Sequence, residues 1–405
     1  MKKIFWIAST YYAEGLPFSL VQQVSVQFFT AAGAGTPVIG LLSLLGLPWN
    51  LKFLWSPLID LFGNKKKWIY LLELALALVA ALLIWPAQEV NLGFAFKLFG
   101  LMAILSATHD MAVDGFYIQT LPKMDQAAFS GLRVAAYRVA MLVGNSLLVI
   151  IAGWLSWILC FSLAAAMLIG LSIWHRKVLP RSLTTREEGQ RWQLVWRSVQ
   201  SYLRQPHIGW ALLFIVLFPA GDALMFAMVT PFLHSLGYGL VARGILTGAI
   251  GTITGIAGSI LGGLFIARWG LQRTIFPLTL IQSFAILGYA WLAYSKPVLI
   301  AVVMVAAFEQ FAAGLGTAVL MVFLMQRCQG GFEAMHFAIG SALMSVASTF
   351  LGSYSGFLVR DFGYASFFLL SFGVALPSLF LAFFMPSAVF LQDQVMSKSP
   401  LSTKP

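Results

Sequence analysis

The sequence predicts an all-α integral membrane protein whose twelve transmembrane helices form two bundles of six. Of its 405 residues, 60% are hydrophobic and only 10% are charged, whereas soluble domains carry roughly 25% charged residues. The apolar residues form long continuous runs, each near the roughly 20 residues that a helix needs to cross a bilayer. Strands of a membrane barrel alternate apolar and polar residues instead, so a barrel is excluded.

Twelve apolar runs, separated by short polar or Gly- and Pro-containing breaks, give the expected spans. The first run follows two lysines, as in a signal peptide, but it continues for about 25 residues and contains Glu14, so we interpret it as a retained helix. The spans cover residues 4–29, 37–61, 67–86, 93–119, 129–152, 155–174, 208–233, 241–266, 272–294, 298–325, 335–358 and 364–386.

The longest polar break lies between the sixth and seventh spans and predicts a linker. In it, Thr185 and Glu188 have the spacing of a helix capping box, and Trp192 and Trp196 recur at helical spacing among arginines. These features predict an interfacial helix beside anionic lipid headgroups, with a plain linker as the alternative. The expected parts are an amino-terminal bundle over residues 1–174, a cytoplasmic linker over 175–207, a carboxy-terminal bundle over 208–386 and a cytoplasmic tail over 387–405.

The net charge of +11 is explained by the membrane rather than by nucleic acid, because Lys and Arg gather in the cytoplasmic loops of membrane proteins. With the amino terminus inside, most cations fall on one side. The other side holds at most Lys97, Arg243, Lys296 and Arg360. We therefore expect a monomer in the inner membrane, with both termini in the cytoplasm and no nucleic acid partner.

Motifs of enzymes are absent from the sequence. It contains no GxxxxGK[ST] loop for ATP, no G-x-S-x-G elbow and no cluster with metal-ligand spacing. The two cysteines, Cys160 and Cys328, lie in or at the end of apolar runs and imply no disulfide framework. We expect no catalytic residues, no metal and no cofactor. The energy for transport would then come from an ion gradient, a substrate gradient or a partner.

A faint repeat relates the two halves. Glu14 of the first span corresponds in position to Asp222 of the seventh, and Asp60 after the second span corresponds to Arg268 after the eighth. Two six-helix halves related as parallel repeats are the architecture of major facilitator transporters.

Ionisable residues inside the spans point to function, because each costs about 2.5–3.5 kcal/mol at the bilayer centre. Asp110 and Asp114 share one helix face, and Arg133 and Arg138 lie at matching depth on the next span. We expect a gating network there, together with Asp60, and proton relay or substrate contact is the alternative. Glu73 is expected only to snorkel or to pair with the lysines at 65–67, and His109 to donate to the two aspartates beside it.

Three carboxylates, Glu14, Asp222 and Glu309, lie near the expected membrane midplane. Desolvation favours the protonated form of such a group and a nearby cation favours the charged form, so each is a candidate proton carrier. Asp222 is the first choice and Glu309 the second. A structural polar contact between helices is the alternative for each.

Lys52, deep in the second span, is the best candidate to bind an anionic substrate group, and pairing with Asp110 or Asp114 is its alternative. Arg138 is a second candidate cation for the substrate. Tyr12 and Trp49 offer aromatic faces suited to sugars, although most such rings pack or anchor at the interface.

Several stretches resemble one transporter family. Residues 56–67 (SPLIDLFGNKKK) are a loose form of the major facilitator loop motif G-x-L-a-D-r-x-G-r-k. More specifically, the chain resembles the AmpG-type permeases of the peptide, acetyl-coenzyme A and drug transporter family. The matching stretches are 12–17 (YAEGLP), 40–49 (GLLSLLGLPW), 51–57 (LKFLWSP), 107–115 (ATHDMAVDG), 137–138 (YR), 221–223 (GDA) and 309–318 (EQFAAGLGTA).

This resemblance implies a major facilitator fold and proton-driven uptake of anhydromuramyl peptides for peptidoglycan recycling. Siderophores and acyl-coenzyme A remain alternative cargoes, because similar permeases carry them. A drug exporter is disfavoured, since the proline-containing motif of such antiporters is absent around residues 144–146. A membrane receptor or enzyme that transports nothing is the remaining class, and it would tolerate loss of the midplane carboxylates.

Overall fold

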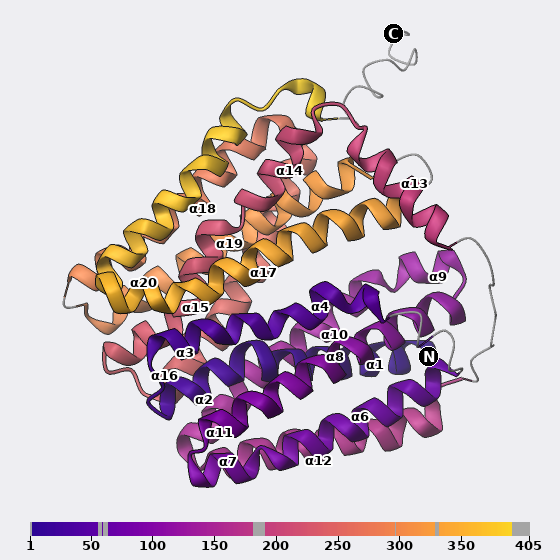
Figure 1. Ribbon diagram of the computed structural model, residues 1–405, viewed down its shortest axis with the longest axis vertical. Helices are drawn as coiled ribbons and strands as arrows, with labels where there is room; N and C mark the ends of the chain where they lie inside the picture. The colour runs from indigo at the N-terminus through magenta and orange to yellow at the C-terminus, as the bar shows by residue number, and fades with distance from the viewer. Residues whose placement is uncertain are drawn as a thin grey trace. The chain divides into compact units, whose positions relative to one another are not determined.

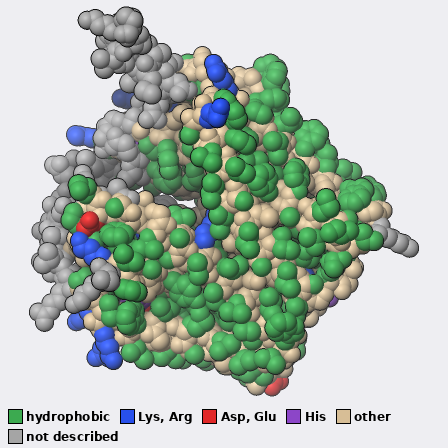
Figure 2. Space-filling view, turned by 180° about the vertical axis from the view of Figure 1, so that it is seen from behind, with side chains coloured by type: hydrophobic (Ala, Val, Ile, Leu, Met, Phe, Trp, Pro, Cys, Tyr) green, Lys and Arg blue, Asp and Glu red, His purple; other side chains and the backbone are tan. Residues whose placement is uncertain are grey.

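The computed structural model describes residues 2–55, 59, 64–180, 191–295, 297–328 and 332–390. All regular secondary structure in these residues is helical. Within the described ranges, nine helices are long and apolar enough to span a membrane. Hydrophobic side chains cover most of the face seen in Figure 2, as expected for a surface in contact with lipid rather than water.

The chain divides into two compact units, and the first comprises residues 1–187 and 228–252. Figure 1 shows its helices. They are α1 (Lys2–Ser19), η1 (Leu20–Val24), α2 (Ser25–Ala31), α3 (Thr36–Leu41), η2 (Leu42–Gly46), α4 (Leu47–Leu51), η3 (Lys52–Leu54), α6 (Lys65–Leu82), α7 (Ile84–Glu89), α8 (Leu92–Thr120), α9 (Lys123–Ala128), α10 (Ser130–Leu142), η4 (Val143–Leu148), α11 (Val149–Trp154), α12 (Trp157–Val178), α16 (Leu240–Arg243) and η5 (Gly244–Ile250).

The second unit comprises residues 188–227 and 253–405. Two helices pass from one unit into the other, α15 (Ala220–Ser235) and α17 (Gly251–Trp269). The remaining helices of the second unit are α13 (Arg191–Leu203), α14 (Ile208–Leu217), α18 (Leu271–Tyr294), α19 (Leu299–Gln326), α20 (Glu333–Phe383) and η6 (Ser387–Val389).

Each of the twelve predicted spans overlaps with helix in the described residues. The first two coincide with α1 to α2 and with α3 to η3, which are not among the nine candidate spans. The last two lie in α20, where Gly363 has φ 73° and ψ 166° and so interrupts the helix between them. Glycine tolerates this positive φ because it has no Cβ. The all-helical membrane fold predicted from hydropathy is confirmed.

Helix packing in the first unit places α1 against α8 and α10, and α6 against α8 and α12. Its core is apolar and aromatic and includes Trp6, Tyr11, Phe116 and Tyr117. Trp6 meets Phe116 edge to face, with 5.4 Å between ring centroids, a geometry that aromatic pairs favour. This core fixes α1 beside α8, and these two helices carry most of the polar residues discussed below.

The second unit has its own core, formed by α14, α18 and α19 with the last residues before position 391. At one end, the fully buried Arg327 donates to the carbonyl oxygens of Pro206 at 3.0 Å and Val389 at 3.1 Å. Burial lowers the pKa of Arg327 and raises the pKa of the nearby Tyr202 to about 12. Arg327 thus joins the segment before α14 to the end of the described chain.

Part of the segment predicted as a linker is helical: α13 lies within it, and its Trp196 and Arg197 are exposed. The proposed capping pair Thr185 and Glu188 lies outside the described residues. Contact of α13 with lipid stays a prediction. So does the division at residues 174 and 208, since compactness alone groups residues 228–252 with the first unit.

Candidate functional site

Two carboxylates on α8 organise the polar site of the first unit. Asp110 and Asp114 are separated by four residues and therefore share a face. Lys52 of η3 forms an ion pair with Asp110. Arg133 of α10 forms another with Asp114, at 2.6 Å between Nη2 and Oδ1.

Aromatic rings hold Arg133 in place. Its guanidinium carbon lies 4.3 Å from the ring centroid of Tyr11 and 4.5 Å from that of Tyr117, which is within cation–π range. The Tyr11 hydroxyl also donates to Asp114, at 2.8 Å. One arginine therefore links α10 to both α1 and α8.

Glu14 of α1 completes the group that we call the charge cluster, namely Glu14, Lys52, Asp110, Asp114 and Arg133. Glu14 lies next to Asp110, and its Oε2 atom is buried without a hydrogen-bond partner in the described chain. The cluster contains three carboxyl groups and two cations. One carboxyl group therefore has no cation to compensate its charge.

Only some of the predicted gating residues lie together in the structure. Arg133 and Asp114 lie together as expected, whereas Asp110 pairs with Lys52, which was the alternative interpretation of that lysine. Arg138 is half-buried on α10 and forms no ion pair with any described residue. Asp60 lies outside the described residues.

The predicted aromatic residues are half-buried in the first unit. Trp49 of α4 packs edge to face against Phe18, with 5.1 Å between ring centroids, which fits the packing alternative. Tyr12 lies on α1 one residue after Tyr11. A role for either ring in binding sugar stays a prediction.

A second polar group lies in the second unit, where Asp222 and Glu309 are 9% and 2% exposed. The amide of Gln282 on α18 donates to Asp222. Glu309 accepts a hydrogen bond from Gln310 at 3.3 Å and lies near both Asp222 and the buried Tyr289. Among the described residues, no Lys, Arg or His forms an ion pair with either carboxyl group. We call Asp222, Glu309 and Gln282 the carboxyl pair site.

Gln282 is not among the predicted site residues, because it is not ionisable, although a neutral amide in an apolar span is also a signal. The interpretation of Glu73 was wrong, since this residue is fully buried and contacts His109 and His175 rather than lysines. His109 accordingly faces Glu73 and not the aspartates. His175 was missed because the sixth span was ended at residue 174, whereas α12 continues to Val178.

Comparison with known proteins identifies the family. The sequence profile described as Major Facilitator Superfamily matches residues 3–332 of this chain. The chain belongs to the major facilitator superfamily. Solved structures agree with its fold: a D-xylose-proton symporter has a TM-score of 0.74 at 13% identity, covering 96% of this chain and 98% of the symporter. The nucleoside transporter NupG has a TM-score of 0.71 at 15% identity, covering 98% of this chain and 100% of NupG.

Among sequence relatives of this major facilitator chain, the anhydromuropeptide permease of Escherichia coli (strain K12) is 28% identical, over 91% of this chain and 77% of the permease. The putative transporter AmpG 4 of Rickettsia conorii is 27% identical, over 93% of this chain and 94% of the relative. The chain is therefore an AmpG-type, multi-pass membrane transporter, and its substrates are small molecules.

Proposed function

We propose that this transporter imports anhydromuropeptides across the inner membrane in symport with protons. The cargo is suggested by the relatives named as anhydromuropeptide permeases. The observation that supports proton coupling is the carboxyl pair site, where two buried carboxyl groups have no ion-pair partner among the described residues. Burying an unpaired charge is costly, so such a pair is suited to bind and release a proton as its hydration changes.

In this proposal Asp222 is the main proton carrier. Because Glu309 lies near it, repulsion disfavours the state in which both carboxyl groups are charged. Glu14 is the corresponding carrier in the first unit, because it lies next to Asp110 in a cluster with one carboxyl group in excess. Two adjacent carboxyl groups repel each other when both are charged. Either location can therefore exchange one proton in each cycle.

Substrate binding is assigned to the cations. An anionic group of the peptide would replace Asp110 as the partner of Lys52. Arg138, which lacks an ion pair in the described chain, would bind a second anionic group of the same substrate. Tyr12 and Trp49 would stack on the sugar rings. When Lys52 exchanges partners, Asp110 loses its cation, and this links substrate binding to protonation of the cluster. The Arg133–Asp114 pair, with Asp60, would open and close as the gate.

The test is uptake of labelled anhydromuramyl disaccharide-peptide into right-side-out vesicles, with and without an uncoupler. We expect uptake that the uncoupler abolishes. Asp222→Asn should remove proton-driven uptake but leave exchange of internal for external substrate. Glu89→Gln is the matched control, because Glu89 is an exposed carboxylate outside both sites. Intact proton-driven uptake in an Asp222→Asn, Glu309→Gln double variant would refute the coupling assignment.

Other cargoes are distinguished by the same vesicles. No muropeptide uptake by folded protein would favour siderophores or acyl-coenzyme A, and accumulation only in inverted vesicles would indicate an exporter. We further propose that the chain works as a monomer, binds no nucleic acid and keeps both termini in the cytoplasm. Reporter fusions at each terminus test the orientation, and the mass of the detergent-solubilised protein tests the oligomeric state.

A further inference from the structure

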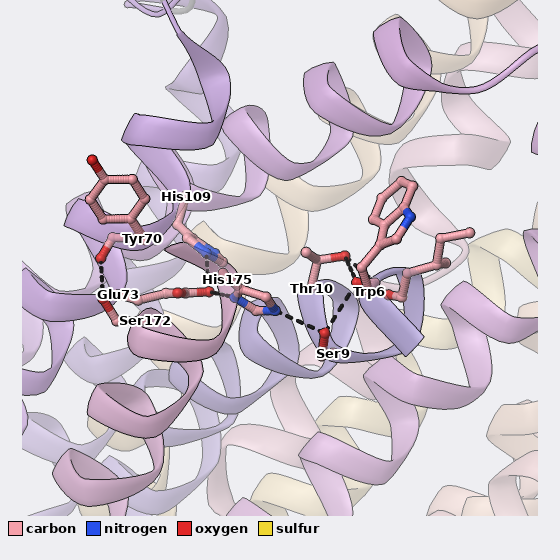
Figure 3. Close-up of polar contacts among 9 residues, drawn as sticks. Trp6, Ser9, Thr10, Tyr70, Glu73, His109, Ser172 and His175 are labelled. Carbon is pink, nitrogen blue, oxygen red and sulfur yellow. Dashed lines mark hydrogen bonds and ion pairs between the residues drawn. The ribbon is translucent and has the colours of Figure 1, made fainter. Parts of the chain in front are cut away.

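Glu73 lies at the centre of a polar network separate from both sites above (Figure 3). Glu73, His109 and His175 are each 0% exposed. The Oε1 atom of Glu73 lies 2.6 Å from Nδ1 of His175 and 3.3 Å from Nε2 of His109. The other ring nitrogen of His175, Nε2, lies 2.9 Å from the hydroxyl of Ser9. This histidine network joins four helices, α1, α6, α8 and α12.

The directions of the hydrogen bonds determine how many protons the network holds. The Ser9 hydroxyl donates to the carbonyl oxygen of Trp6 at 3.2 Å, so its oxygen accepts from a proton on Nε2 of His175. The 2.6 Å contact between Nδ1 and Glu73 also requires a proton, because two lone pairs would repel each other at that distance. Glu73 and His175 together therefore hold two protons and carry no net charge.

The second histidine indicates where the shared proton lies. Oε1 of Glu73 also faces Nε2 of His109, and an oxygen that accepts two N–H bonds is best described as a carboxylate. His175 is then an imidazolium and His109 a neutral ring with its proton on Nε2. These protonation states follow from the bonding pattern. Consistent with them, Nδ1 of His109 has no hydrogen-bond partner in the described part of the chain, so no acceptor there favours a proton on that nitrogen.

Among the described residues, no other cation forms an ion pair with Glu73. The groups that face Glu73 are His109 from α8 and His175 from α12, and the Ser9 hydroxyl from α1 faces the other ring nitrogen of His175. The hydroxyl of Ser172 on α12 does not contact Glu73 but donates a hydrogen bond to the carbonyl oxygen of Tyr70 on α6, at 2.6 Å. Among the other charged residues of these helices, Asp110 pairs with Lys52, Asp114 with Arg133 and Lys3 with Asp125, and Lys66 donates to the carbonyl oxygen of Leu179. Lys67, Lys97, Arg176 and Lys177 are exposed, and Glu14 belongs to the charge cluster.

We propose that the histidine network is a further proton-binding site, distinct from the carboxyl pair site and the charge cluster, and that the proton between Glu73 and His175 holds α1, α6, α8 and α12 together. Two of these helices also carry the charge cluster: α1 bears Ser9 and Glu14, and α8 bears the neighbours His109 and Asp110. Loss of the proton at alkaline pH leaves a buried carboxylate facing an unprotonated nitrogen. Glu73 and His175 are positioning residues, and their role does not depend on the identity of the cargo.

Nitrogen-15 NMR of protein labelled only at histidine tests the protonation state directly. The chain has five histidines, and single His→Gln variants assign them. If His175→Gln does not fold, variants of the other four assign His175 by elimination. We expect the two ring nitrogens of His175 to be protonated at neutral pH. A neutral His175 ring in the folded wild-type protein at neutral pH would overturn the proposal.

Thermal unfolding in detergent from neutral to alkaline pH tests what the proton does. The melting temperature of the wild-type protein should fall as pH rises, because the ion pair is lost. The Glu73→Gln, His175→Gln double variant should show a clearly smaller fall, since its neutral side chains can still hydrogen bond. His234→Gln is the control, because His234 is exposed, and it should keep the wild-type profile. Coincident profiles for the wild-type protein and the double variant would contradict the proposal.

Discussion

Replacing Gly258 by alanine tests how closely α17 and α19 pack in the second unit. A Cβ atom added there would lie 2.0 Å from the carbonyl oxygen of Phe311 and 2.9 Å from its carbonyl carbon. Phe311 follows Glu309 by two residues on α19. A displacement of α19 at this point would therefore move the carboxyl group of Glu309 relative to Asp222.

The structure sets the size of the effect. To restore the 3.0 Å that real Cβ atoms keep, the two helices must separate by 3.0 − 2.0 = 1.0 Å. No change of rotamer relieves the contact, because the obstacle is backbone. Overpacking typically costs about 1–3 kcal/mol, and a gap of this size also forfeits a quarter to a half of the dispersion energy between facing atoms. We expect a loss of about 2–3 kcal/mol in the free energy of unfolding.

Gly263→Ala on the same helix is the matched control. A Cβ atom at Gly263 meets no described atom within 4 Å, and alanine is favoured over glycine in a helix by about 1 kcal/mol. Denaturant unfolding in mixed micelles measures both variants, and vesicle uptake measures transport. We expect Gly258→Ala to lose stability and transport, and Gly263→Ala to keep both. If the two variants were equally stable, the close packing of α17 and α19 would be refuted.

Three further substitutions probe the polar sites. Arg133→Gln removes a partly exposed ion pair with Asp114, worth about 0.2–1 kcal/mol, and two cation–π contacts worth about 0.5–1 kcal/mol each. The free energy of unfolding should fall by this modest sum while vesicle uptake falls strongly, and a larger loss of stability with normal uptake would contradict the gating role. Gln282→Leu leaves Asp222 without its donor, which should cost about 1–3 kcal/mol and shift the pH dependence of uptake, and an unchanged pH profile would count against proton carriage there. Arg327→Met removes two charge-assisted hydrogen bonds to buried carbonyl oxygens, so the free energy of unfolding should fall by about 3–5 kcal/mol. Thermal unfolding measures this loss, and Arg327→Lys should recover part of it. Unaltered unfolding would show that Arg327 does not stabilise the contact between the segment before α14 and the end of the described chain.

Membrane spans were predictable because the bilayer imposes a local requirement. About 20 consecutive apolar residues per helix is a condition that each segment meets by itself, and every predicted segment contains helix among its described residues. Their ends were less predictable. The sixth span was ended at residue 174, but α12 continues through His175 to Val178, and His175 contacts Glu73 of α6 and Ser9 of α1.

The site was predictable only as a set of candidates. Spacing along one helix placed Asp110 and Asp114 on a common face, and depth placed Arg133 near them, as the structure has it. Sequence could not decide whether Lys52 contacts Asp110 or remains available for substrate. It also placed His109 beside the aspartates, whereas adjacent residues on a helix point about 100° apart, and His109 faces Glu73.

The sequence by itself therefore determined the all-helical membrane class and the membership of an AmpG-like family, since these follow from apolar run length and from contiguous motifs. Tertiary structure alone decided the partners of the buried charges: Lys52 with Asp110, Gln282 with Asp222 and Glu73 with two histidines. The physical reason is that a buried charge must be compensated but any nearby helix can supply the partner. Which helix does so depends on packing between segments far apart in the chain.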